Sequence, residues 1–449
     1  MAILVAGENN ECMMRAFLIG ATASGSGKTT FTLGVLRALE RRGQIVAPFK
    51  CGPDYIDSQF HNKAVGRNCS VNLDPFFETP AELRRTFSHY SSSADVSVIE
   101  GVMGLYDGYR AAWGSSAEVA TSLNVPVVLL VNAKSSAYSV APVLYGFRHF
   151  VSPELEKAPR IAGVVFNRVA SESHYQYLLS ACQTVGLQAL GYLPKMEEVA
   201  VPDRHLGLDT TAIDSYDAQI ERIADAVEAH VDLEALLNLS TVFLPTEKSD
   251  WPDFSATSSL RIGVAQDEVF NFVYRANLDQ LSRLGKLTFF SPMRDSALPD
   301  ADLLYFPGGY PEFYLHELSS NRQMLAAVRS YAEKGGRILA ECGGMMYLSD
   351  SVRGMDGLTY PMVGLFKQEA TMEGMKLQLG YRQFEYAGRK WRGHEFHYSR
   401  VLSPLPSLVQ MQTARGGDVA TALWRRDNVI ASYVHLYWGN RSDILSLFD

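Results

Sequence analysis

The segment GATASGSGKTTFTLGVLRALERRG, residues 20–43, joins an apolar run to a helix-forming stretch through a loop of small residues. The run before it, AFLIGAT, is typical of a buried strand. Strand, glycine-containing loop, Lys-Thr and helix in this order are the context of a phosphate-binding loop. The segment therefore predicts the first strand and crossover helix of a parallel α/β sheet.

The loop is built to hold a nucleoside triphosphate. Gly25 and Gly27 would let the backbone approach phosphate oxygens, and successive N–H groups can form an anion-binding nest. Lys28 would place positive charge at the β- and γ-phosphates, and the Thr29 hydroxyl can hold Mg²⁺. The strict pattern has glycine where this chain has Thr22, and the alternative is a Gly/Ser-rich turn that caps a helix. We expect ATP to contact Ser24, Gly25, Ser26, Gly27, Lys28, Thr29 and Thr30.

The composition is that of a globular protein without a nucleic-acid or membrane partner. Hydrophobic residues make up 47% and charged residues 20%, and the net charge is -8 with 41 scattered basic residues. This balance argues against nucleic-acid binding, and no stretch approaches the roughly 18 apolar residues of a membrane span. The five cysteines form no CxxC pair, and the N-terminus has no basic stretch of the kind that opens a signal peptide. We therefore expect a protein of the reducing cytoplasm.

A chain of 449 residues is too long for one ordinary core. Apolar runs alternate with helical patterns in both halves, and the stretch between them, STVFLPTEKSDWPDFSATSS, has the composition of a linker. We predict two doubly wound, Rossmann-like α/β domains, 14–238 and 260–449, joined by a linker at 239–259. The strands expected in the second domain are LRIGVAQD, KLTFFSP, DLLYFPGG, GRILAECGG and NVIASYVH.

Four acidic residues follow strands of the first domain. Glu100 ends VSVIEG, Asp54 and Asp57 lie in PFKCGPDYIDSQFH, and Asp107 lies in LYDG. At one edge of a sheet these carboxylates would repel one another unless a cation lay among them. We expect Thr29, Asp54 and Glu100 to bind Mg²⁺, with Asp57 and Asp107 in an acidic substrate site. The alternative for each acid is a solvated loop position or a helix cap.

Three further polar residues of the first domain are candidates for ligand contacts. Asn167 ends the strand GVVFNR, where an amide could contact the nucleotide base. Arg67 and Arg110 carry the positive charge that substrate carboxylates would need. These three assignments rest on position alone.

The segment GRILAECGGMMYLSD, residues 336–350, combines an apolar strand, a Cys-Gly-Gly turn and a helix-forming stretch. This is the arrangement of a nucleophile elbow, and a thiol at the start of a helix is expected to have a lowered pKa. Gly343 and, in FPGGYPE, Gly309 could offer backbone N–H groups to an oxyanion. His435, at the end of the strand in SYVHLYW, is a candidate base. The alternative is that Cys342 is an inert core residue and His435 a buried polar residue with its hydrogen bonds satisfied.

These motifs together resemble a known family. FPGGYPE, AECGGMMYL and YVHLYW resemble a class I glutamine amidotransferase domain of the cobyrinate type, and KCGPDYID and EGVMGLYDG resemble the matching synthetase domain. From about Met14 to the C-terminus, the chain resembles the cobyrinate a,c-diamide synthase family. The resemblance implies that Cys342 attacks glutamine and that His435 activates it. It also implies that Lys28 and Thr29 belong to the ATP loop and that Asp54, Glu100 and Asp107 serve metal, nucleotide or substrate.

The resemblance implies a two-site amidation. ATP with Mg²⁺ would convert the a and c carboxylates of cobyrinate to acyl phosphates, and ammonia released from L-glutamine would displace the phosphate. Ammonia would need a protected route, since bulk water at neutral pH would protonate it. Cobyrinate, L-glutamine and ATP are the expected small-molecule partners, and the sequence leaves a homodimer open.

One position departs from the wider amidotransferase class. That class has a glutamate two residues after its histidine, whereas this chain has Tyr437. The cobyrinate-type branch is similar in lacking this acid, so slow intrinsic glutaminase turnover is expected. The segment HEFHYS, residues 394–399, is also typical of the family, and we assign no metal to its two histidines.

Other functions share parts of this pattern. The same chemistry could act on hydrogenobyrinate or nickel-sirohydrochlorin, and motifs alone do not separate these substrates. Cobyric acid synthase has the same two-domain plan but is not expected to carry EGVMGLYDG. A partition-type ATPase switch would account for the first half, yet it leaves Cys342, His435 and FPGGYPE without a role.

Overall fold

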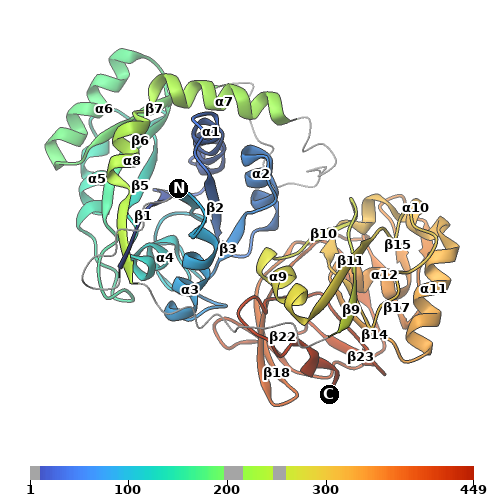
Figure 1. Ribbon diagram of the computed structural model, residues 1–449. Helices are drawn as coiled ribbons and strands as arrows, with labels where there is room; N and C mark the ends of the chain where they lie inside the picture. The colour runs from blue at the N-terminus through green and yellow to red at the C-terminus, as the bar shows by residue number, and fades with distance from the viewer. Residues whose placement is uncertain (1–10, 197–215, 246–258) are drawn as a thin grey trace. The chain divides into compact units, whose positions relative to one another are not determined.

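The computed structural model describes residues 11–196, 216–245 and 259–449. They belong to two compact units, Met1–Trp251 and Pro252–Asp449, each described by itself below (Figure 1). The residues before 11 and most of the expected linker, 246–258, lie outside the described residues. Within the described ranges, no helix combines the length and the apolar character needed to cross a lipid bilayer.

The first unit is a parallel sheet between layers of helices (Figure 1). Its strand order is β3-β2-β4-β1-β5-β6-β7, and every neighbouring pair on this path is parallel. Strands β2 and β4 are buried at every residue, as expected where helices cover both faces. The predicted α/β class is therefore confirmed. The strands are β1 (Glu11–Ala21), β2 (Val46–Cys51), β3 (Val71–Leu73), β4 (Val96–Glu100), β5 (Val127–Asn132), β6 (Ile161–Val169) and β7 (Ala189–Pro194).

Local sequence signals set the ends of the helices in this unit. Thr79 and Glu82 form a capping box at the start of α3, with Pro80 in the first turn. Gly66 ends α2 in the left-handed conformation, at φ 66°. The helices are α1 (Lys28–Arg41), α2 (Tyr55–Val65), α3 (Pro80–Ser91), α4 (Ser116–Leu123), α5 (Val140–His149), α6 (Glu172–Val185), α7 (Asp217–His230) and α8 (Leu233–Leu239).

The expected linker starts later than the sequence suggests. Strand β8 (Thr241–Pro245) pairs antiparallel with the first half of β1, from Glu11 to Arg15. The apolar letters of TVFLP therefore belong to a strand, and the prediction of a linker from residue 239 is wrong for these residues. The Ser, Thr and Asp on either side make this short run look like a linker in sequence, but pairing with β1 satisfies its backbone.

The second unit contains a second parallel sheet, with strand order β11-β9-β12-β14-β24-β23. Its pairs are parallel except for the edge pair β23–β24. All five predicted strands lie in this sheet or continue directly from it. The elements are β9 (Leu260–Ala265), α9 (Arg275–Leu284), β11 (Gly285–Phe290), β12 (Leu303–Phe306), α10 (Leu315–Ser320), α11 (Arg322–Glu333), β14 (Arg337–Glu341), α12 (Gly343–Leu348), β23 (Leu423–Arg426) and β24 (Val429–Ser432).

The second unit also contains antiparallel sheets, so a plain doubly wound fold is an incomplete description of it. The unit has a four-stranded sheet, a five-stranded sheet and the pair β10–β13. The strands of the pair come before Cys342 in the sequence, and those of the two larger sheets come after it. Their strands are short or half-exposed, which weakens the apolar pattern that reveals a buried strand. They are β10 (Phe270–Phe272), β13 (Gly308–Gly309), β15 (Ser349–Arg353), β16 (Thr359–Pro361), β17 (Phe366–Thr371), β18 (Gln378–Tyr386), β19 (Arg389–His397), β20 (Arg400–Leu402), β21 (Met411–Thr413), β22 (Asp418–Val419) and β25 (His435–Leu436).

Candidate functional site

The first candidate site is the loop between β1 and α1. Gly25 and Gly27 have φ values of 71° and 93°, in the left-handed region that favours glycine. Ser26 is buried and donates a hydrogen bond to the Ala23 carbonyl at 2.7 Å, whereas Ser24 is exposed. The buried Lys28 ammonium donates to the Met103 carbonyl. The loop thus has the backbone form of an anion-binding nest at the start of a 14-residue helix.

The side-chain amide of Asn167 holds this loop. Its Nδ2 donates to the Ser26 carbonyl at 2.8 Å, and its Oδ1 accepts from the Arg168 backbone N–H at 2.8 Å. A Cβ added at Gly27 would lie 2.2 Å from Asn167 Nδ2, so only glycine fits between the loop and this amide. Each amide atom of Asn167 thus has a backbone partner that holds the phosphate loop, and a contact between Asn167 and the nucleotide stays a prediction.

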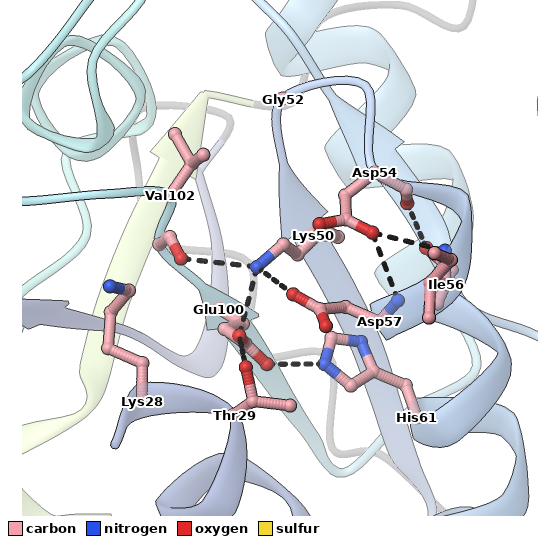
Figure 2. A network of polar contacts seen from close by, with 12 residues as sticks. Lys28, Thr29, Lys50, Gly52, Asp54, Ile56, Asp57, His61, Glu100 and Val102 are labelled. Carbon is pink, nitrogen blue, oxygen red and sulfur yellow. Dashed lines mark hydrogen bonds and ion pairs between the residues drawn. The ribbon is translucent and has the colours of Figure 1, made fainter. Parts of the chain in front are cut away.

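A buried network of charges lies beside the loop (Figure 2). The Thr29 hydroxyl donates to Glu100 Oε1 at 2.7 Å, and Lys50 Nζ lies 2.9 Å from the same oxygen. Lys50 also contacts Asp57 Oδ2 at 2.6 Å, and His61 Nε2 lies 2.6 Å from Glu100 Oε2. Glu100, Lys50 and His61 are almost completely buried. Lys50 therefore places one positive charge between two of the carboxylates at this sheet edge, Asp57 and Glu100.

Burial by itself would raise the pKa of Glu100, but the charge of Lys50 and the contact with His61 hold that pKa well below its ordinary value. The carboxylate is therefore ionised at neutral pH, and both of its oxygens accept contacts. An ionised carboxylate beside the first turn of α1 is the group needed to orient a cation near bound phosphates.

Replacing Glu100 with glutamine is expected to destabilise the first unit, because the buried Lys50 would keep only one carboxylate partner, Asp57. Breaking a buried ion pair costs about 3 kcal/mol or more, which lowers the Tm of a domain of this size by roughly 6–12 °C. The pKa of Glu100 is lowered in the folded state, so its contribution is present at neutral pH and is lost as the pH falls below about 4.

Scanning calorimetry at pH 7 and pH 4 checks this prediction. The matched control is Glu234→Gln, which breaks the exposed pair between Glu234 and Arg42 at 2.9 Å and should cost less than about 1 kcal/mol. Equal Tm shifts for the two variants at pH 7 would contradict the buried-network interpretation.

Asp54 and Asp107 organise the backbone of the same sheet edge. Asp54 is the N-cap of α2, and its Oδ1 accepts hydrogen bonds from Ile56 N and Asp57 N at 3.0 Å each. The exposed Asp107 accepts from Gly104 N at 2.9 Å. These contacts are those of the helix-cap and loop alternative, and they leave the metal and substrate roles of Asp54 and Asp107 as predictions.

The two arginine candidates have partners within the first unit. Arg67 contacts the Glu40 carboxylate and donates to the Val46 carbonyl at 3.0 Å. The Arg110 guanidinium lies over the ring of Trp113, 5.1 Å from its centroid. Their roles toward a substrate stay predictions.

Sequence reasoning does not single out Lys50 and His61. The first clue to them is a lysine inside the apolar run VAPFKC, since lysine is almost never buried without a partner. The second is spacing, because His61 follows Asp57 by four residues and so lies on the same face of α2.

The second candidate site is the turn between β14 and α12. Cys342 has φ 46° and ψ -105°, a strained conformation for a residue with a side chain. Its backbone N–H donates to the Ser432 carbonyl at 2.8 Å, and the thiol lies 3.7 Å from the Phe396 carbonyl. The predicted strand, tight turn and helix are present, and the strain at Cys342 is typical of a nucleophile elbow.

The two candidate oxyanion-hole residues are in direct contact. A Cβ added at Gly343 would lie 3.1 Å from Gly309 O and 3.2 Å from Gly309 N. Gly309 itself has φ 153°, and a Cβ there would overlap the Val269 carbonyl. Backbone atoms therefore crowd both glycines and leave no room for a side chain at either position. The oxyanion role of their N–H groups stays a prediction.

His435 lies against Gly308, the residue before Gly309. It starts β25, is 1% exposed, and its ring would be 2.1 Å from a Cβ added at Gly308. Burial lowers the pKa of His435 to about 3, with help from the nearby His394 and His397. The imidazole is therefore neutral at physiological pH and able to accept a proton.

The expected lowering of the thiol pKa is not found. Burial raises the pKa of Cys342, the carboxylate of Glu312 raises it further, and the Gly343 N–H only partly opposes them. Desolvation outweighs the helix N-terminus because α12 has only six residues and Cys342 is only 3% exposed. The resting pair is thus a thiol and a neutral imidazole, so a base must remove the thiol proton during the reaction.

The segment HEFHYS forms a buried polar network next to the thiol. His397 Nε2 lies 2.8 Å from Glu395 Oε1, and His397 Nδ1 lies 2.8 Å from the Ser399 carbonyl. Arg382 and Thr421 donate to the other oxygen of Glu395. Both nitrogens of His397 are engaged within the protein. Among the described residues, no group of three or more His, Cys, Asp or Glu side chains is placed to hold a metal ion.

Comparisons with known proteins match each of the two units to a family. Residues 17–208 match the family model of the CobQ/CobB/MinD/ParA nucleotide binding domain, and residues 261–443 match that of the CobB/CobQ-like glutamine amidotransferase domain. The chain is 40% identical to the cobyrinate a,c-diamide synthase of Salmonella typhimurium, with 96% of each chain covered. It is 41% identical to the synthase of the same name from Caldanaerobacter subterraneus, covering 94% of this chain and 95% of that one. It is also 38% identical to the hydrogenobyrinate a,c-diamide synthase of Brucella anthropi, covering 94% and 98%. The chain therefore belongs to the cobyrinate a,c-diamide synthase family, as its motifs predicted.

Proposed function

We propose that this protein amidates the a and c carboxylates of cobyrinate, using ATP and glutamine, in cobalamin biosynthesis. The observation that carries the proposal is the 40% identity to a cobyrinate a,c-diamide synthase along 96% of the chain. It is supported by the two sites, a phosphate loop beside an ionised carboxylate in the first unit, and a strained cysteine elbow and a buried, neutral histidine in the second.

The first unit activates the acid. A carboxylate does not react with ammonia because oxide is a poor leaving group, so a carboxylate oxygen of the substrate attacks the γ-phosphorus of ATP and ADP leaves. The product is an acyl phosphate, from which ammonia later displaces phosphate to give the amide. Lys28 and the loop N–H groups stabilise the charge on the transferred phosphoryl group.

Thr29 and Glu100 fit a magnesium ion that arrives with the nucleotide. Their side-chain oxygens lie 2.7 Å apart, and hard oxygen ligands are those Mg²⁺ prefers when it also binds substrate phosphates. When bound, Mg²⁺ would neutralise charge on the β- and γ-phosphates. Asp54 Oδ1 already caps α2, so we place it at the edge of this site.

The second unit releases ammonia. Cys342 attacks the side-chain amide carbon of glutamine, and the thiol proton passes to His435 and then to the departing nitrogen. The backbone N–H groups of Gly309 and Gly343 stabilise the oxyanion. Water then hydrolyses the thioester, which frees glutamate and restores the thiol.

Mass spectrometry of purified protein with cobyrinate, ATP, Mg²⁺ and glutamine tests the proposal. The expected result is conversion of two carboxylates to amides, with no product when ATP or the nitrogen source is omitted. A parallel reaction with hydrogenobyrinate is warranted because relatives of that name are 38% identical to this chain. The proposal would be refuted if neither cobyrinate nor hydrogenobyrinate were amidated.

Replacing Gly308 with alanine is expected to stop glutamine use. The added methyl group would lie 2.1 Å from His435 Cε1, so the imidazole must move. A displacement of about 1 Å at a catalytic group can cost about 10²-fold in rate. The measurement is the glutamate release rate, with ammonia-dependent amidation expected to be unchanged.

The matched control for this change is Gly417→Ala, whose added Cβ would meet only Thr413 Oγ1 at 3.6 Å, an ordinary contact. It should retain glutamate release. A Gly308 variant as active as this control would show that the ring position does not matter for the reaction.

A further inference from the structure

We propose that Glu341 is a positioning residue that ties the histidine strand to the nucleophile turn. It would serve in place of the acid that Tyr437 replaces after His435. This inference rests on the proposed roles of Cys342 and His435 in glutamine hydrolysis. It concerns a residue that lies directly before the nucleophile and that the proposed mechanism does not use.

The contacts of Glu341 join three segments. Its Oε1 accepts a hydrogen bond from the backbone N–H of Leu436 at 3.0 Å, and Leu436 is the residue after His435. Its Oε2 accepts from the Tyr305 hydroxyl at 2.7 Å. Glu341 is the last residue of β14, and Cys342 follows it. One side chain therefore connects the start of the nucleophile turn to the peptide that follows the candidate base.

This connection spans a break in the sheet. Strand β24 pairs with β14 only as far as Ser432, which lies opposite Glu341. The chain then leaves this sheet, and His435 pairs with His394 of β19 in a different sheet. Backbone pairing with β14 thus stops three residues before the histidine. The Glu341 side chain supplies the hydrogen bond to the chain beyond that point.

Burial of the Glu341 carboxyl group lowers the stability of the fold unless hydrogen bonds compensate for it. Glu341 is 2% exposed, and its two partners lie in an apolar cluster with Leu339 and Trp438. Burying a carboxyl group among apolar side chains is unfavourable unless it is hydrogen-bonded. Burial also raises the pKa of Glu341 to about 8, so the group is mostly neutral at pH 7. A neutral carboxyl group still accepts from Leu436 N and can donate to the Tyr305 hydroxyl.

The expected consequence is a fixed direction for His435. The ring already lies against Gly308, and holding the next peptide sets the backbone from which the ring projects. Loss of Glu341 should therefore lower the turnover number for glutamine more than it changes KM, since substrate contacts remain. Ammonia-dependent amidation does not use His435 and should not change.

The test compares Glu341→Ala, Glu341→Gln and Tyr305→Phe, with Leu339→Ala as the control. Leu339 lies two residues earlier on the same face of β14 and packs in the same cluster, so its truncation loses packing without touching the hydrogen bonds. We expect Glu341→Ala to lower kcat for glutamate release about 100-fold, with KM within about threefold of the parent. Glu341→Gln can keep both hydrogen bonds and should retain kcat within about fivefold.

Several outcomes would overturn the inference. The inference is overturned if Glu341→Ala keeps full glutamine turnover, if it loses no more turnover than Leu339→Ala, or if it loses ammonia-dependent amidation to the same extent. If the alanine variant does not fold, Tyr305→Phe is used instead, because it removes only one hydroxyl. An unchanged kcat in Tyr305→Phe, together with a fully inactive Glu341→Gln, would count against the role. Failure of the proposed function is recognised separately, because the parent protein would then not release glutamate at all.

Discussion

Replacing Cys342 with alanine is expected to abolish amidation from glutamine while amidation from added ammonia continues. The thiol is the only nucleophile that the elbow places at the start of α12, and alanine cannot form the thioester. Removing the nucleophile of a covalent mechanism costs on the order of 10⁴-fold or more. The acyl phosphate chemistry lies in the first unit and needs only ammonia, so the two nitrogen sources should separate.

The measurement is the rate of product formation with each nitrogen source, together with glutamate release. Cys182→Ala is the matched control, since Cys182 is also a buried free cysteine but belongs to α6 of the first unit. Its substitution should leave both rates within about threefold. Loss of ammonia-dependent activity in Cys342→Ala would contradict the two-site scheme, provided that calorimetry shows a folded protein.

The pKa values explain why this nucleophile is expected to be slow by itself. Burial raises the pKa of the Cys342 thiol and lowers that of His435 to about 3, so the pair rests in its uncharged form. In the proposed mechanism, the thiolate forms when the His435 imidazole accepts the thiol proton. Alkylation of the free protein by iodoacetamide should therefore be slower at pH 7 than that of an exposed cysteine.

Buried strands could be predicted from sequence because both faces of their sheets are covered. LLYF of β12 and the residues of β4 before Glu100, VSVI, are continuous apolar or small runs, and every residue in both strands is buried. The half-exposed hairpin β18–β19 gave no such run, because QLGYRQFEY buries only Arg382 and Phe384. Its burial of an arginine depends on a distant carboxylate, Glu395, which no local pattern reveals.

The same distinction applies to the candidate sites. The phosphate loop and the cysteine turn are local motifs, so their residues were found from spacing. Lys50, His61 and Glu341 contact partners far away in sequence. An ionisable residue in an apolar run is the local trace of Lys50 and Glu341, and the spacing from Asp57 is that of His61. The thiol pKa was predicted in the wrong direction because a sequence shows the helix start but not the desolvation of the sulfur.

Replacing Lys28 with alanine is expected to stop amidation with either nitrogen source while glutamate release persists. In the proposed mechanism its ammonium is the positive charge that the loop offers to the transferred phosphoryl group. Lys28 is 8% exposed, and its ammonium donates a hydrogen bond to the Met103 carbonyl. Removing one group that stabilises charge in a transition state costs about 10²–10³-fold. The loop backbone should survive, since Ser26 and Asn167 hold it without Lys28.

Product formation and glutamate release are measured for this variant beside Lys157→Ala, which removes an exposed lysine that donates a hydrogen bond to Asn124 Oδ1 at 3.0 Å. The control should keep both activities. Because Lys28 and Cys342 lie in different units, their substitutions should give opposite patterns: one keeps glutamate release and loses all amidation, the other loses glutamate release and keeps ammonia-dependent amidation. If Lys28→Ala still amidates cobyrinate from ammonia at the parent rate, phosphoryl transfer does not depend on this loop, and the acid must be activated elsewhere.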